Sequence, residues 1–244
     1  MSKHQIKGAL MINEGGVYEH TDFKMHDYGV IGMTENGDIY RYAILAADVV
    51  AGMLLVADGR DSCHADIPLA ADAAVGDTSV SITLGAGAII ADELDEGWLC
   101  FTDVSPEGEA YKIVSHPVSA GSEAATFYLD RPLVTAATTS SEVTLVKNPW
   151  NRPAVSQLIA ERPAGVTVSD WDVSEAQYGW LKTKGTQPVL QDSTGTTVGY
   201  MCSISNQTNG AVGVHSDDDT EYVIGQLMQE GTATEFNPVY LMID

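Results

Sequence analysis

The sequence predicts an all-β protein of the sandwich or jelly-roll type, built from many short antiparallel strands with little helix. Gly is frequent, at 23 residues, and Val, Thr and Ser are abundant, which favours strands and turns. The segment "DTSVSITLG" alternates apolar and polar residues, as expected of an antiparallel strand with one buried face. Further short apolar runs follow, separated by turn-forming segments such as "SPEGE" and "TTSSE".

Residues 1–36 show neither a helical nor a strand period. Two interpretations remain open: a loosely ordered terminus, or an extended N-terminal arm that becomes ordered on a partner. The segment holds apolar side chains that need a surface to bury them. We therefore predict an interface that includes Val17, Tyr18, Phe23, Met25 and Tyr28, together with Trp150 and Trp180.

Residues 37–150 are expected to form a β-rich domain. The apolar runs predict strands at 39–42, 53–56, 79–84, 98–102, 111–114, 126–129 and 143–146. The segments "AAVGDTSVSITL" and "VSAGSEAATFYL" share one build, with small residues, a Gly-centred turn and then a strand. They predict two hairpin-like units of related design.

The segment "KNPWNRP" (147–153) has two prolines around Trp150 and is the best candidate for a boundary. Residues 151–244 are then a second β-rich portion, either separate from the first or packed on it as one domain. "AVSQLIAERP" is compatible with one short helix between Pro153 and Pro163. The expected strands of this portion lie in "YGWLKTKG", "TVGYMCSIS", "EYVIGQLM" and "PVYLMI".

Charge and composition exclude several classes of function. The formal net charge is −22, from 34 acidic and 12 basic residues, so we expect neither nucleic-acid binding nor attachment to anionic lipid. The sequence has no apolar run of membrane-spanning length and no secretory signal, which predicts synthesis in a cytoplasm. Three widely spaced cysteines do not make a disulfide framework.

The motifs predict no catalytic residue, metal ligand or cofactor. "TLGAGAII" lacks the third glycine of a dinucleotide fingerprint, and "DSCHAD" (61–66) lacks a second pair of zinc ligands. "HSDDDTEY" (215–222) has consecutive acids and no central Gly, unlike a calcium-binding EF-hand loop. We interpret it as the polar tip of a hairpin, with weak surface Ca²⁺ binding as the alternative.

Seven segments between residues 40 and 185 resemble, in pattern and order, the head decoration (capsid cement) and related structural proteins of tailed-phage virions. These are "YRYAILAADVVAGMLL", "AVGDTSVSITLG", "GWLCFTD", "GEAYKIVSHP", "TFYLDRPL", "SEVTLVKNPW" and "YGWLKTKG". The resemblance implies a β-rich, non-enzymatic protein made in the host cytoplasm. It also implies a location on the capsid exterior, with the major capsid protein and copies of itself, often as a homotrimer, as partners. The chain is longer than many cement proteins.

Two other functions stay open at this point. One is a tail or fibre module that recognises a host surface glycan, for which the sequence offers Trp98, Trp150, Trp171 and Trp180 as stacking residues. The other is an enzyme, for which the sequence supplies no positive evidence.

Overall fold

The structure is a computed structural model that describes residues 8–57, 62–157, 162–172, 177–192, 198–216 and 221–244. It is all-β, and the only helical elements among these residues are two short 3₁₀ turns, η1 (Gly16–Tyr18) and η2 (Ser62–His64). The predicted fold class is therefore confirmed. The chain forms two compact units, unit 1 (Met1–Asp58 and Arg152–Asp244) and unit 2 (Gly59–Asn151).

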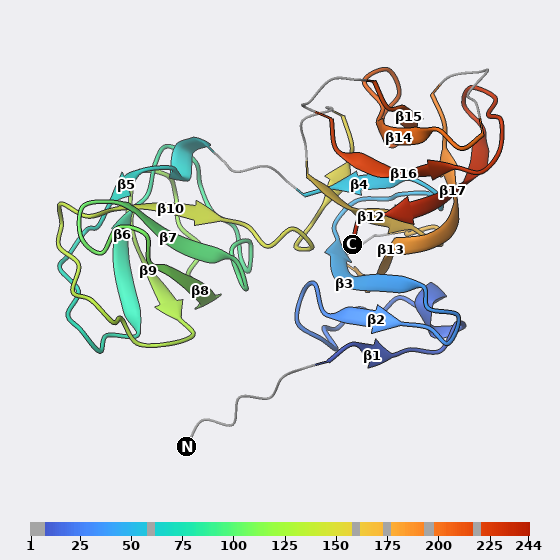
Figure 1. The fold of residues 1–244 in the computed structure, drawn as a ribbon. Helices are drawn as coiled ribbons and strands as arrows, with labels where there is room; N and C mark the ends of the chain where they lie inside the picture. The colour runs from blue at the N-terminus through green and yellow to red at the C-terminus, as the bar shows by residue number, and fades with distance from the viewer. Residues whose placement is uncertain (1–7, 58–61, 158–161, 173–176, 193–197, 217–220) are drawn as a thin grey trace. The chain divides into compact units, whose positions relative to one another are not determined.

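Unit 2 is a six-stranded sheet that closes on itself. Its strands are β5 (Ile67–Pro68), β6 (Ser79–Thr83), β7 (Trp98–Asp103), β8 (Ala110–Ser115), β9 (Ala124–Leu129) and β10 (Glu142–Val146). Their order in the sheet is β5-β10-β7-β8-β9-β6 (Figure 1). A bridge between Leu69 and Ile82, with the Ala70 amide donating to the Ser81 carbonyl at 2.8 Å, joins β6 to the end of β5.

The strands of unit 2 alternate as the sequence predicts, and one face of each strand fills a common core. In β6, Val80 and Ile82 are buried while Ser79, Ser81 and Thr83 are half-buried. In β9, Phe127 and Leu129 are buried and Tyr128 is exposed. All residues of this core cluster lie within residues 67–145, so unit 2 has a hydrophobic core of its own.

Unit 1 contains the other sheet. Its strands are β1 (Leu10–Met11), β2 (Ile31–Met33), β3 (Ile39–Leu45), β4 (Leu54–Val56), β11 (Ala154–Val155), β12 (Pro163–Thr167), β13 (Gln177–Leu190), β14 (Met201–Ile204), β15 (Val212–Val214), β16 (Val223–Leu227) and β17 (Phe236–Met242). The main path runs β1-β2-β3-β13-β17-β16-β14-β15, and β12 links β13 to β4, which also pairs with β11.

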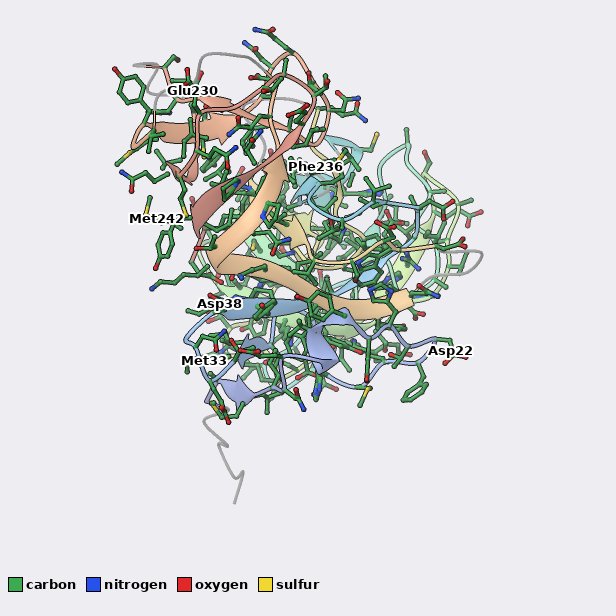
Figure 2. The ribbon with its side chains drawn as sticks, turned by 90° about the vertical axis from the view of Figure 1, so that its right-hand side faces the viewer. Asp22, Met33, Asp38, Glu230, Phe236 and Met242 are labelled. Carbon is green, nitrogen blue, oxygen red and sulfur yellow. The ribbon has the colours of Figure 1, made fainter. Side chains whose placement is uncertain are left out.

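Strand β13 joins the two halves of this sheet and is visible as a long, bent strand in Figure 2. Residues 177–184 pair with β3, and residues 184–190 pair with β17. Gly185 has φ +106°, a conformation that other residues rarely adopt, and a Cβ there would meet the Asp38 carboxylate. Next to this glycine, the buried Lys182 ammonium donates to Asp38 at 2.5 Å and to the Thr186 carbonyl at 2.7 Å.

The N-terminal segment differs from the arm that the sequence suggests. Among residues 8–36, β2 pairs with β3 and β1 pairs with β2, so the segment extends the sheet of unit 1. Val17 and Tyr28 are buried in this unit. The missing sequence period has a simple cause: strands of two and three residues are too short to show one.

The structure also divides the chain differently from the sequence prediction, which places the boundary after residue 150. Unit 2 leaves unit 1 after β4 and returns at β11, and these strands are paired, with Val56 opposite Ala154. Unit 2 is thus an insertion between neighbouring strands. Residues 154–155 are a strand and not the start of a helix; residues 158–161 of the expected helix lie outside the described residues.

We expect each unit to fold without the other. Since residues paired across antiparallel strands are about 5 Å apart, a short Gly-Ser linker in place of residues 59–151 should join β4 to β11 as a hairpin. The product should keep a β-type circular dichroism spectrum and melt cooperatively, and so should a fragment of residues 59–151. An unfolded deletion product would contradict the insertion.

Candidate interaction surface

The last strand of unit 1 has apolar residues on both faces. Val239 and Leu241 of β17 are fully buried in the core of unit 1. On the opposite face, Phe236, Tyr240 and Met242 are 46%, 39% and 39% exposed. Figure 2 shows Phe236 and Met242 at the two ends of this strand.

Strand pairing extends this apolar surface over four strands. Tyr240 lies opposite Thr186 of β13 on one side and Gln226 of β16 on the other. Gln226 in turn lies opposite Met201 of β14, so one row crosses all four strands. We call this surface the outer face and define it as Lys184, Thr186, Pro188, Met201, Gln226, Met228, Phe236, Pro238, Tyr240 and Met242.

The neighbouring row is more apolar than this one, in which Thr186 and Gln226 are polar. Pro188 lies opposite Pro238, and the Met228 amide donates to the Pro238 carbonyl at 3.0 Å. Met228 is itself exposed, and the Thr186 hydroxyl contacts its sulfur at 3.6 Å. The ring of Phe236 lies over Gly52, where a Cβ would come within 2.6 Å of the ring. Phe236 is therefore held in place although almost half of it is exposed.

The ten residues that define the outer face include no carboxylate, although the chain has 34 acidic residues; Asp217, Asp218 and Asp219, in the connection that follows β15, lie outside the described residues. Lys184 is its only ionisable group apart from the Tyr240 hydroxyl, whereas Glu230 and Glu235 lie in the connection before β17 and are exposed. A contiguous, exposed apolar area of this kind is a marker of protein contact. The sequence contains a signal for this face. In "PVYLMI" (238–243), both the even-numbered and the odd-numbered residues are largely apolar, whereas a strand with one solvated face needs only one apolar set.

Of the seven interface residues predicted from the sequence, three are corrected by the structure. Val17, Tyr28 and Trp180 are buried within unit 1, where they are not available to another chain. The rings of Tyr28 and Tyr178 stack, and Trp180 packs against Tyr42. Tyr18, Phe23 and Met25 are exposed on the N-terminal segment, and Trp150 is half-buried at the end of unit 2. These four stay predictions, and none belongs to the outer face.

A hollow of about 210 Å³ lies beside the aromatic residues of unit 1. It is bordered by rings of His26, Tyr42, Tyr178 and Trp180 and by Glu19. Tyr42 and Trp180 are buried, and the Tyr42 hydroxyl accepts a hydrogen bond from the Met25 amide at 3.0 Å. These rings pack on one another, and because Tyr42 and Trp180 are buried they are not available for stacking on a sugar. Trp171 is also buried, which leaves Trp98 and Trp150 for that role.

The acidic segment is not the tip of a hairpin. Strands β15 and β16, which precede and follow it, both pair with β14, one on each side, and so are not paired with each other. Residues 217–220 lie outside the described residues. Glu221 accepts hydrogen bonds from the Ser203 and Ser216 hydroxyls at 2.8 Å and lies 3.1 Å from His215. Burial raises the pKa of Glu221, but a hydrogen bond from the Ser216 amide, the two hydroxyl hydrogen bonds and His215 outweigh it and hold the pKa below its usual value.

The described residues also contain no group of three His, Cys, Asp or Glu side chains placed to hold a metal ion. In "DSCHAD", Asp61 lies outside the described part of the chain and His64 is buried. The described residues around Cys63 do not form a group of metal ligands. Burial raises the pKa of Cys202 to about 12, so this thiol stays protonated and is a poor nucleophile.

Comparisons with known proteins found no match: no family model, no curated protein and no solved structure is similar to the chain. Within the part of the chain that the structure describes, no helix has the length and apolar character needed to cross a bilayer.

Proposed function

We propose that the protein is a non-enzymatic structural component of a tailed-phage virion that binds the outer surface of the head, contacts the major capsid protein and stabilises the shell. The observation that carries the proposal is the outer face, a largely apolar surface on a chain of net charge −22, which supports a structural role in an assembly formed by copies of this chain on a shell. Such a surface is typical of proteins that bind other proteins. The assignment to a virion, and to its head, rests on the resemblance of residues 40–185 to head decoration proteins.

The charge of the chain supports a position on the outside of a head. A protein with 34 acidic and 12 basic residues is repelled by packaged DNA, whereas the exterior of a shell imposes no such penalty. In the assembly that the resemblance implies, the protein is made in the host cytoplasm and its copies associate with one another, often as a trimer.

The test is to mix purified protein with heads that lack it. The protein should sediment with the heads, saturate at a fixed number of copies per shell and raise the temperature at which the heads release their DNA. An unrelated acidic protein of similar size is the control for trapping in the pellet. Binding to tails and not to heads would instead favour the tail or fibre function, and binding to neither would contradict the virion role.

A further inference from the structure

We propose that the outer face of unit 1 is the surface through which copies of this chain contact one another. The inference deepens the proposed function by assigning a partner to that surface. It concerns the purified protein in solution, so it can be tested without heads.

The area of the outer face is sufficient for such a contact. Met201, Met228, Phe236, Tyr240 and Met242 are each between 39% and 51% exposed. Large side chains at that exposure leave roughly 80–100 Å² each, so together with the prolines and Thr186 the face offers on the order of 600 Å². A specific interface buries about 800 Å² per partner, so the outer face would provide most of the area of such an interface.

Charge favours the outer face over the rest of the surface as the place where two copies meet. Two copies of net charge −22 repel each other wherever their carboxylates approach. The outer face is a region where they can come together without burying a carboxylate, because it has Lys184 as its only charged residue. The exposed Glu230 and Glu235 are not in the central row of Thr186, Tyr240, Gln226 and Met201; they follow Met228 and precede Phe236, where they fit the polar rim of an interface.

The chemistry of the face also fits a self-contact. Three of its apolar residues, Met201, Met228 and Met242, have flexible thioether side chains that adapt to an irregular surface. Tyr240 and Phe236 supply rigid rings of the kind that dominate binding energy at interface centres. A pair of chains would use the outer face twice, whereas a ring of three would join it to a different surface of the neighbouring copy.

The test compares two substitutions of opposite charge at the centre of the face. Tyr240→Glu and Tyr240→Lys should both weaken self-association at least tenfold in sedimentation equilibrium, since either one places an unpaired charge in an apolar contact. Lysine lowers the net negative charge. If the contact depended on overall charge alone, Tyr240→Lys would strengthen association and only Tyr240→Glu would weaken it.

Thr186→Lys is a second test at an exposed position in the same row, where no core contact is lost. Phe23→Glu is the matched control, because Phe23 is an aromatic residue that is 61% exposed but lies on the N-terminal segment. All variants should keep the wild-type spectrum and melting temperature. Wild-type association should tighten as NaCl rises from 0.05 to 0.5 M, because salt screens the repulsion between acidic copies.

Three outcomes would overturn the inference: a wild-type chain that is monomeric at millimolar concentration, oligomers that Tyr240→Lys leaves intact, or oligomers that only Phe23→Glu dissociates. If the wild type is monomeric yet binds heads, and Tyr240→Lys abolishes that binding, the face contacts the shell. The proposed function would then survive while the self-contact fails.

Discussion

Replacing Phe127 by alanine is expected to destabilise unit 2 by about 3–5 kcal/mol, the usual effect of deleting a fully buried aromatic ring. Phe127 is 0% exposed, and its ring stacks on His116 with centroids 5.6 Å apart. Domains of this size have only about 5–15 kcal/mol of stability, so the variant should be marginally folded in this unit. Hydrogen exchange followed by mass spectrometry measures the loss for each strand separately.

Tyr128 provides the matched control for this substitution. It is the next residue of the same strand but points outward and is 51% exposed. Tyr128→Ala should therefore change the stability of unit 2 by no more than about 1 kcal/mol. Since every residue of the core cluster around Phe127 belongs to unit 2, the strands of unit 1 should keep their protection in both variants. Equal loss of protection in both units would show that their cores are not independent.

The second large effect is expected at Lys182. The side chains of Lys182 and Asp38 are 6% and 23% exposed, and the ammonium is 5.6 Å from the centre of the Tyr40 ring. Lys182→Met leaves the Asp38 carboxylate without this cation and the Thr186 carbonyl without this donor. Because Asp38 keeps some contact with water, we expect a loss of about 2–4 kcal/mol, at or below the usual range for a broken buried pair. Urea denaturation measures it.

Two further variants make this result interpretable. Lys184→Met removes a half-buried lysine from the outer face and should cost no more than about 0.5 kcal/mol. The double variant Asp38→Asn/Lys182→Met removes both charges, so its loss should be smaller than the sum of the two single losses by about 1–3 kcal/mol. Additive losses would mean that the ion pair does not stabilise the bend of β13.

The sequence predicts the strands of this protein well because their signal is local. Alternation identifies β6, and short apolar runs between turn segments identify β7, β8, β9 and β10, all to within two residues at each end. The apolar segments near residues 180, 202, 225 and 240 also contain strands. Strand pairing has no such signal. Nothing near residue 56 indicates that it lies opposite residue 154, so the insertion of unit 2 could not be predicted.

The predicted interface failed in part for a related reason. Apolar residues without a period, such as Val17 and Tyr28, were assigned to a partner, whereas the chain buries them on its own sheet. For Trp180, residue type alone gave no way to decide between core and surface. The outer face was missed because each of its residues looks ordinary alone. Only the register of β13, β17, β16 and β14 brings Thr186, Tyr240, Gln226 and Met201 into one row.

The insertion also determines the order in which the protein can fold as it is synthesised. Unit 2 is continuous in sequence and can complete its sheet once residue 151 has been made. Strand β3 must wait for β13, because Arg41 pairs with Leu181. At a synthesis rate of about 5–20 residues per second, that wait lasts roughly 7 to 28 seconds. During this time β3 has only the three-residue strand β2 beside it, and β4 has no partner until β11 and β12 have been made. A nascent chain is therefore most prone to aggregate at the stage when unit 2 is already folded and unit 1 is incomplete.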